Sequence, residues 1–495
     1  MGSGTRAIGL HASMSLQPIL PADALARNFT DLKPPLRPQE ALVEASRCLY
    51  CFDAPCIMAC PTGIDVPAFI KKIASGNPAG AARTILTANI LGASCARVCP
   101  TAVLCEGACV LDDRDEQPIQ IGRLQRYATD YVAERNISVL PPPPAPGSGN
   151  RIAVIGAGPA GLGCAAELAR LGHRVTVFER KKQAGGLNTY GIAYYKMKPQ
   201  VSLAEVELVR SLGVDIRTGV AVGKDVAIDQ LEKDYAAIFV GVGLGTATRL
   251  RIPGEGLPEV VDALDFISQI HTDPLHTIPV GRRVGVIGCG NTAIDAVTQA
   301  KRLGAQRAFI VYRRDEQDMS AYDFEYEHAK HDGAQFLFKA APVEIMATDG
   351  HVSGIKLVLT HLVNGRAEPT LGSEWIEPCD LVLKAVGQEK QTKLLRDLFP
   401  ALTVDSRGVI AHDPLTGQTN VPHLFTGGDC GNGGREVVNA VGEGKKAALG
   451  IHAFLTKDKA GPPVQPSRLG AKQGSAGSGL MAPIRAHELE AAMKK

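Results

Sequence analysis

The sequence predicts a multidomain protein, in which an α-helical N-terminal domain precedes two nested α/β domains with parallel sheets. Three observations support this fold class. Eight of the twelve cysteines lie between Cys48 and Cys109, and a proline-rich stretch occupies residues 141–149. Two apolar segments, at 151–155 and 283–287, each run into a glycine-rich loop. Such segments are typical of strands that feed a helix through a tight turn.

Length and charge limit the function classes. A chain of 495 residues suggests about three domains at the usual ~100–200 residues per domain. The net charge of +2 gives no indication of a nucleic-acid or anionic-membrane partner. The first twenty residues lack a signal-like apolar run, and the most apolar window, 152–166, is too short to span a bilayer. We therefore expect a soluble, cytoplasmic protein.

The clustered cysteines form two runs. They read Cys48-x2-Cys51-x4-Cys56-x3-Cys60-Pro61 and Cys95-x3-Cys99-Pro100-x4-Cys105-x3-Cys109. Disulfides suit a small secreted domain, and zinc sites prefer two Cys-x2-Cys pairs, of which only one is present. Iron–sulfur clusters take four thiolates each, and a Cys-x3-Cys-Pro ending is typical of them. Eight thiolates fit two [4Fe–4S] clusters, while the spacing leaves open which cysteine binds which cluster.

The region before the proline run contains three predicted helices. Residues 67–74, 79–88 and 121–134 have helical patterns. A proline run followed by Gly and Ser is typical of a domain boundary. The sequence thus predicts an α-helical iron–sulfur domain over residues 1–140.

The first glycine-rich loop has the features of a dinucleotide site. Strand 151–155 leads into Gly156, Gly158 and Gly161, and strand 174–178 ends at Glu179. In a Rossmann-like domain the glycines let backbone N–H groups reach a pyrophosphate, and the acid binds a ribose hydroxyl. A simple crossover turn is the alternative interpretation.

The second loop differs where the acid is expected. Residues 288–293 repeat the glycine pattern, but strand 307–312 ends in Arg313 and Arg314. Arginines there can accept a 2′-phosphate, which makes NADPH plausible, although both could simply face solvent.

The C-terminal half is expected to complete both domains. Residues 380–387 read as a returning strand, 422–426 as a strand entering Gly427-Gly428-Asp429, and 436–448 as a helix. The expected division is an FAD domain at 141–279 and 389–455, with an NAD(P)H domain at 280–388 between its parts. Residues 456–495 are expected to form a flexible tail, with a helix possible at 482–495.

Several stretches resemble known families. "RCLYCFDAPCIMACPTGIDVPAFI", "GASCARVCPTAVLCEGAC" and "PIQIGRLQRYA" resemble the amino-terminal region of dihydropyrimidine dehydrogenase. Both nucleotide domains resemble that enzyme and the small subunit of bacterial glutamate synthase, and "DMSAYDFEYEHAKHDG" is similar to the same group. The resemblance covers nearly all of 40–455. Without an FMN-binding barrel after 455, the chain is similar to the separate electron-input subunit of bacterial NAD-dependent dihydropyrimidine dehydrogenase, the PreT type.

The resemblance implies a ligand set for each cluster. One cluster would be held by Cys48, Cys51, Cys56 and Cys109. The other would be held by Cys60, Cys99, Cys105 and Gln125, with Cys95 as a neighbour. From its own pattern alone, Gln125 reads as a polar residue on an amphipathic helix.

The resemblance also implies nucleotide-binding residues. For FAD these are Gly156, Gly158, Pro159, Ala160, Gly161, Glu179, Gly186, Leu187, Lys196, Gly428 and Asp429, with Lys196 near the flavin. For the nicotinamide nucleotide they are Gly290, Asn291, Thr292, Ala293, Arg313, Arg314, Ala385 and Gly387. The NADPH-using animal enzymes carry a further basic residue where this chain has Ser320, so NADH is slightly favoured.

The resemblance implies an electron-input subunit. NAD(P)H would reduce FAD, and two [4Fe–4S] clusters would pass electrons to an FMN-containing partner that reduces uracil or thymine, within a hetero-oligomer such as a heterotetramer. The alternatives are the small subunit of glutamate synthase, a ferredoxin-linked NAD(P)H oxidoreductase, and a non-catalytic iron–sulfur sensor.

Overall fold

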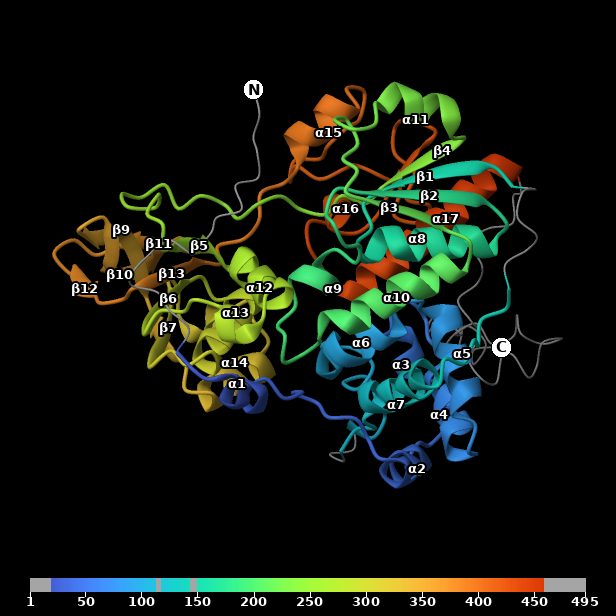
Figure 1. The fold of residues 1–495 in the computed structure, drawn as a ribbon, viewed down its shortest axis with the longest axis horizontal. Helices are drawn as coiled ribbons and strands as arrows, with labels where there is room; N and C mark the ends of the chain where they lie inside the picture. Colours follow the sequence, from blue (N-terminus) through green and yellow to red (C-terminus); the bar gives the residue numbers. More distant parts are fainter. Residues whose placement is uncertain (1–18, 113–116, 143–148, 458–495) are drawn as a thin grey trace, which may run out of the picture.

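The fold is seen in a computed structural model that describes residues 19–112, 117–142 and 149–457 (Figure 1). The predicted tail at 456–495, including the possible helix at 482–495, lies almost wholly outside these ranges. None of the described helices is long and apolar enough to cross a bilayer.

The N-terminal domain is helical, as predicted. Its helices are α1 (Ala22–Asn28), α2 (Pro38–Ser46), α3 (Pro55–Met58), α4 (Val66–Ala74), α5 (Pro78–Ala88), α6 (Gly92–Val98) and α7 (Ile121–Glu134), with a 3₁₀ turn η2 (Thr101–Val103). The predicted helices at 67–74, 79–88 and 121–134 are confirmed as α4, α5 and α7. Asp65 and Asn77 cap α4 and α5, because their side chains accept the N–H groups of Ala68 and Gly80.

The first sheet is parallel and five-stranded, in the order β14-β4-β1-β2-β3. Its strands are β1 (Arg151–Ile155), β2 (Arg174–Glu179), β3 (Asp215–Thr218), β4 (Ala237–Val240) and β14 (Leu424–Thr426). The associated helices are α8 (Pro159–Arg170), α9 (Leu187–Tyr190), α10 (Pro199–Ser211), α11 (Ile228–Asp234), α15 (Thr392–Leu398), α16 (Asp429–Asn432) and α17 (Val437–Thr456). Because β14 comes from the end of the chain, this sheet encloses the intervening unit in sequence, as predicted.

The second sheet is also parallel, in the order β5-β13-β6-β7-β8. Its strands are β5 (Val260–Asp262), β6 (Arg283–Ile287), β7 (Arg307–Tyr312), β8 (Gln335–Phe338) and β13 (Leu381–Lys384), accompanied by α12 (Ala263–Thr272), α13 (Asn291–Arg302) and α14 (Asp323–His331). The returning strand expected within 380–387 is β13. Strand β5 precedes residue 280, where this domain was expected to begin, yet it pairs with β13. The second α/β unit therefore begins earlier in the chain than the sequence predicts.

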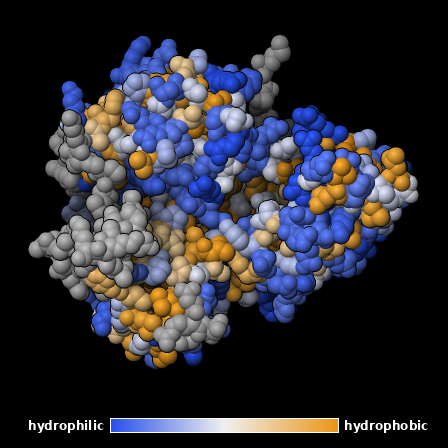
Figure 2. Space-filling view, turned by 180° about the vertical axis from the view of Figure 1, so that it is seen from behind, coloured by the Kyte–Doolittle hydropathy of each residue, from blue (hydrophilic) through white to orange (hydrophobic). Residues whose placement is uncertain are grey.

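An antiparallel sheet forms an addition that the sequence reading missed. It contains β9 (Ala340–Thr348), β10 (His351–Val363), β11 (Arg366–Pro369) and β12 (Trp375–Glu377). Strands β9, β11 and β12 each pair with β10. This sheet lies at the far end of the lobe that carries the second parallel sheet (Figure 1). From behind, the molecule is largely hydrophilic and is hollowed between this lobe and the rest (Figure 2).

The N-terminal segment connects two parts of the molecule. Helix α1 packs on the second α/β unit, where Asn28 Nδ2 donates to Arg302 O at 2.8 Å. Leu25 and Phe29 share a buried core with Phe266 of that unit. The chain then crosses to α2 in the helical domain (Figure 1). Helix α1, although it falls within the helical domain expected at 1–140, therefore packs on the second α/β unit and not on the helices that surround the cysteines.

Candidate cofactor sites

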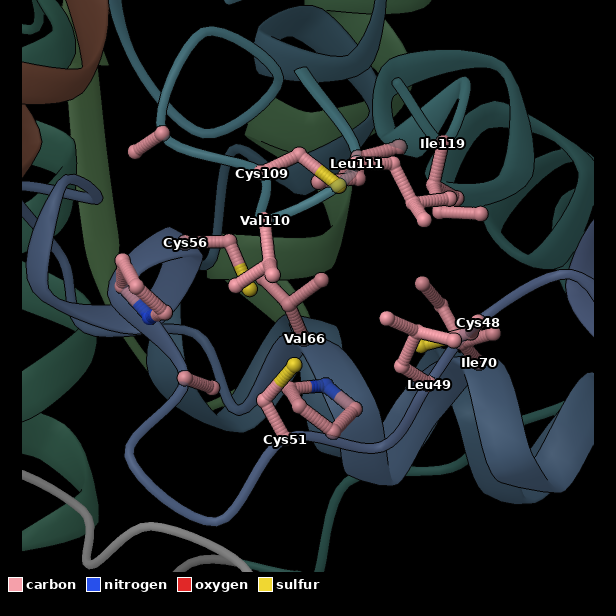
Figure 3. Close-up of a pocket in the computed structure, with 15 residues that line it drawn as sticks. Cys48, Leu49, Cys51, Cys56, Val66, Ile70, Cys109, Val110, Leu111 and Ile119 are labelled. Atoms are coloured by element: carbon pink, nitrogen blue, oxygen red, sulfur yellow. The ribbon is translucent and has the colours of Figure 1, made fainter. Parts of the chain in front are cut away.

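The first cysteine group lines one cavity (Figure 3). Cys48, Cys51, Cys56 and Cys109 come from three segments, and apolar side chains such as Val66 and Ile70 of α4 complete the lining. None of the twelve cysteines forms a disulfide. Burial, together with the nearby Cys48, Cys109 and Cys51, raises the pKa of Cys56 to about 12. Without a metal the Cys56 thiol is therefore neutral, and metal binding must displace its proton.

The second group lies against the first α/β unit. The thiols of Cys60, Cys99 and Cys105 are close enough to act on one another electrostatically. A hydrogen bond with Cys95 and burial raise the pKa of Cys99 well above its usual range. Helix α17 of the first α/β unit approaches this group so closely that a methyl group on Gly442 would lie 2.7 Å from the carbonyl oxygen of Pro61.

Gln125 is buried on α7, and its Nε2 donates to Gly92 O at 2.7 Å. This bond uses the amide nitrogen and leaves Oε1 as the atom that could bind iron. Cys95, expected as a neighbour of this cluster, lies close enough to Cys99 to contribute to the raised pKa of that thiol. Among the described residues, no hydrogen bond joins Gln125 to Cys60, Cys99 or Cys105.

The donor sets suit clusters of several irons. Two groups of soft sulfur donors, each gathered from separate segments, match the ligand chemistry of iron–sulfur clusters. Within the described ranges, no three His, Cys, Asp or Glu side chains converge closely enough to hold a single metal ion. The thiols thus form no preformed mononuclear site.

The first glycine loop leaves room for a ligand. Gly156 has a φ of +101°, and Gly161 packs so tightly that a methyl group there would lie 1.9 Å from Gly156 O. At Gly158, the N-cap of α8, a methyl group would meet no atom nearer than Gly186 Cα at 3.9 Å. Packing therefore explains two of the glycines but not Gly158, whose open side fits close approach by a pyrophosphate to Pro159 and Ala160.

Glu179 is oriented by the backbone. Its carboxylate accepts the N–H groups of Ala157 at 2.9 Å and Lys181 at 2.8 Å. This places the acid beside the glycine loop, as a ribose-binding residue requires. Gly186 faces the same loop with a φ of +58°, and Leu187 after it is 38% exposed.

The loop after β14 completes this site. Gly428 N donates to Glu443 Oε2 at 2.8 Å, and a methyl group on Gly428 would lie 2.8 Å from Ala160 Cβ. Burial raises the pKa of Asp429, which accepts the N–H of Arg435 at 3.2 Å. Glu443 is not among the residues predicted from the sequence, because its only signal is a carboxylate on a helix otherwise rich in small residues.

Lys196 connects the two α/β units. Its Nζ lies 2.6 Å from Asp295 Oδ1 on α13 and 2.6 Å from Glu325 Oε1 on α14, and all three side chains are buried. Burial opposes the charge, but the carboxylates outweigh it and raise the pKa of Lys196. The sequence predicts Lys196 near the flavin, and neither carboxylate partner is predicted from the sequence.

The second glycine loop faces Ser320. A methyl group on Gly290 would lie 3.2 Å from Ser320 Oγ, and Asn291 Oδ1 accepts the N–H of Tyr322 at 3.1 Å. Thr292 and Ala293 form the first turn of α13, while Ala385 and Gly387 follow β13. Gly387 has a φ of +93°, with open space on its Cα.

The two arginines after β7 are available to an anion. Arg313 is exposed and Arg314 is half-buried. Neither forms an ion pair with any residue that the structure describes, whereas Lys339 nearby pairs with Asp315 at 2.7 Å. Two free guanidinium groups at the end of the second strand are what a 2′-phosphate site requires.

The fold and these sites define a class of protein. Residues 150–444 match the family model for pyridine nucleotide-disulphide oxidoreductases. Residues 25–137 match a model described as dihydropyrimidine dehydrogenase domain II, 4Fe-4S cluster. The chain is therefore an oxidoreductase with an iron–sulfur domain and flavin and NAD(P)H sites.

Individual relatives narrow the class. The chain is 35% identical over 457 residues to glutamate synthase [NADPH] small chain of Halomonas elongata, covering 88% of this chain and 95% of that protein. It is 34% identical over 440 residues to NADP(+)-dependent formate dehydrogenase subunit beta of Moorella thermoacetica, covering 83% of this chain but only 61% of that subunit. This chain belongs to the glutamate synthase small-chain-like family of flavin and iron–sulfur oxidoreductases.

Solved structures share the fold. The complex of Mycobacterium tuberculosis FprA with NADPH superposes with a TM-score of 0.52 at 21% identity, over 69% of this chain and 93% of that one.

Proposed function

We propose that this chain is an electron-input subunit that takes electrons from NADPH and delivers them to a flavin-containing partner through two [4Fe–4S] clusters. The observation that carries the proposal is the order of the sites. The Cys60 group lies against α17 of the FAD unit, whereas the Cys48 group is flanked by Leu49, Phe52 and Met58, each at least half exposed. When bound, FAD supplies the step from hydride to single electrons, which the clusters carry onward.

The roles of the chain's own residues follow from their placement. The backbone at Gly158 and the carboxylate of Glu179 bind and orient FAD. Gln125, through Oε1, is the proposed fourth ligand beside Cys60, Cys99 and Cys105. Lys196, held by Asp295, keeps the nicotinamide-binding unit in register with the FAD unit.

We propose NADPH rather than the NADH that the sequence alone slightly favoured. Ser320 supplies no charge, but Arg313 and Arg314, which pair with no described residue, supply two. The names of the relatives from Halomonas and Moorella, which specify NADPH and NADP(+), support the same choice.

For the partner, we propose an FMN-containing subunit that reduces uracil or thymine, assembled with this chain as a hetero-oligomer. The description of the matched iron–sulfur domain and the buried Gln125 support this partner. The second candidate is the large subunit of glutamate synthase, which the near-complete coverage of that enzyme's small chain favours.

The test uses the purified, cofactor-loaded chain with each candidate partner. Alone, it should reduce ferricyanide from NADPH and leave uracil untouched. An FMN-barrel partner should then restore uracil reduction, and Gln125→Ala should suppress that coupled activity far more than ferricyanide reduction, since a dye can draw electrons directly from FAD.

Gln117→Ala, an exposed glutamine near the same domain, is the matched control and should change neither rate. Equal loss of both rates in an FAD-loaded Gln125→Ala protein would refute the ligand assignment. Coupling to glutamate synthase instead of the pyrimidine partner would establish the second candidate.

A further inference from the structure

Helix α10 contacts both the loop of residues 184–189, here called the FAD loop, and the cysteine-bearing helix α6. On the FAD side, Ser202 Oγ is hydrogen-bonded to Thr189 Oγ1 at 2.8 Å, and Thr189 Oγ1 donates to Ala184 O at 2.7 Å. A methyl group on Gly185 would lie 2.5 Å from Ser202 Oγ. Ser202 therefore holds the loop of residues 184–189, which contains Gly186 and Leu187.

Glu205 lies one turn further along α10 and holds the helical domain. Its Oε1 accepts the backbone N–H groups of Ala93 at 2.8 Å and Ser94 at 2.9 Å, and Ser94 Oγ donates to its Oε2. The residue is 4% exposed. Because residues three apart share a helix face, the FAD-loop contact and the α6 contact sit on the same side of α10.

The helix that Glu205 holds carries the second cysteine group. Cys95 lies in α6, and Cys99 is its C-terminal cap, with its N–H donating to Cys95 O at 3.1 Å. From the helical domain, Gln125 binds Gly92 O, and Arg97 pairs with Asp130 at 2.7 Å. Among the described residues, Glu205 is the residue of the FAD unit that accepts hydrogen bonds from the first turn of α6.

We infer that Glu205 is a positioning residue that fixes the helix bearing Cys99 relative to the FAD loop, and so sets the separation across which electrons pass between them. The inference rests on the proposed function. It assigns to the α10 carboxylate a task that neither nucleotide motif nor cysteine motif performs.

The chemistry of the contact predicts an order among variants. A carboxylate offers two oxygens to three donors. Glu205→Gln keeps one acceptor oxygen and the side-chain length, Glu205→Asp retracts the carboxylate by one methylene, and Glu205→Ala removes it. Glu207→Ala on the same helix is the matched control, because its side chain is 71% exposed.

The experiment uses the full, cofactor-loaded chain under anaerobic conditions. After mixing with NADPH, flavin bleaching should proceed at the wild-type rate in every variant. The later bleaching of the iron–sulfur absorbance should be slower by about tenfold or more in Glu205→Ala, and near the wild-type rate in Glu205→Gln and Glu207→Ala. Exchange of the Ala93 and Ser94 amide hydrogens should quicken in Glu205→Ala, a readout that requires no electron transfer.

Further outcomes decide the inference. Wild-type cluster reduction in an iron-loaded Glu205→Ala protein would overturn it. If that variant loses iron, Ser94→Ala and Glu205→Asp, singly and combined, replace it: coupled effects on cluster reduction support the contact, and strictly additive effects overturn it. A wild-type chain that reduces no cluster with NADPH would refute the proposed function, whereas unchanged amide exchange in Glu205→Ala would refute only the positioning role.

Discussion

At the residue scale, the proposed preference for NADPH rests on Arg313 and Arg314. Arg313 and Arg314 follow the second strand of their sheet, where an acid would favour a ribose hydroxyl, and neither is paired with a described residue. In the proposed site they would bind the 2′-phosphate of NADPH through charge-assisted hydrogen bonds, which contribute about 1.5–3 kcal/mol.

Replacing both arginines should abolish the preference. We expect Arg313→Gln/Arg314→Gln to lower kcat/KM for NADPH by about 10- to 100-fold and to leave that for NADH nearly unchanged. Dye-coupled kinetics with each nucleotide would measure this, with Arg366→Gln, an exposed arginine on β11, as the control. An equal loss with both nucleotides would contradict the assignment.

Glu205 also predicts a pH dependence of stability. Burial, only partly offset by its hydrogen bonds to Ser94 and Ala93, raises its pKa from 4.5 to about 7. Since the folded state then binds more protons than the unfolded state between these values, stability should fall as the pH rises through this window, by about 3 kcal/mol.

The Tm of wild-type and Glu205→Gln holoprotein, compared between about pH 5 and about pH 8, would test this. The wild-type advantage should shrink with rising pH by several degrees, and Glu207→Gln should track wild type throughout. A pH-independent difference would show that Glu205 does not titrate in this window.

At the scale of elements, glycines allow helices α8 and α17 to pack closely together. A methyl group on Gly444 of α17 would lie 2.0 Å from Ala160 O, so the two helices touch through their backbones. Gly158, in the first glycine-rich loop at 156–161, has no such neighbour. The two glycines thus serve different needs, one for packing and one for a ligand.

This difference gives a paired prediction. Gly444→Ala should destabilise the fold, because a backbone carbonyl cannot move aside. Gly158→Ala should leave the Tm of the FAD-free chain within about 1–2 °C of wild type, yet weaken FAD binding by about tenfold or more. Thermal unfolding would measure the Tm of each variant, and flavin content with FAD titration would measure FAD binding. Full FAD affinity in Gly158→Ala would place the pyrophosphate elsewhere.

At the scale of the whole molecule, the N-terminal segment and α10 hold three units in one arrangement. Arg126 of α7 binds Asp31 at 2.6 Å and Lys33 O at 2.7 Å, while α1 packs on the second α/β unit. Lys196 and Glu205 link the FAD unit to its two neighbours. The order of sites along the proposed electron path therefore depends on contacts between units.

The whole chain should carry two clusters. Anaerobically purified protein should contain about eight irons and eight acid-labile sulfides per chain. Since cluster binding is linked to folding, removing the iron should lower the Tm of the helical domain. Metal and sulfide analysis would check this, and stoichiometric zinc with little iron would exclude the electron-transfer function.

The fold class could be predicted from the sequence, because strand-to-glycine loops and clustered cysteines are local patterns that fix local structure. The sequence also located α4, α5 and α7 and both parallel sheets. The antiparallel sheet of β9–β12 was not predicted, since that insertion carries no motif. Nothing in the sequence indicated that β5, which precedes residue 280, pairs with β13. The partners of Lys196, the Ser94–Glu205 contact and the approach of α17 to Pro61 join residues far apart in the chain. These contacts are seen only in the folded structure, because they depend on how whole units pack and have no signature in the periodicity or spacing of the sequence.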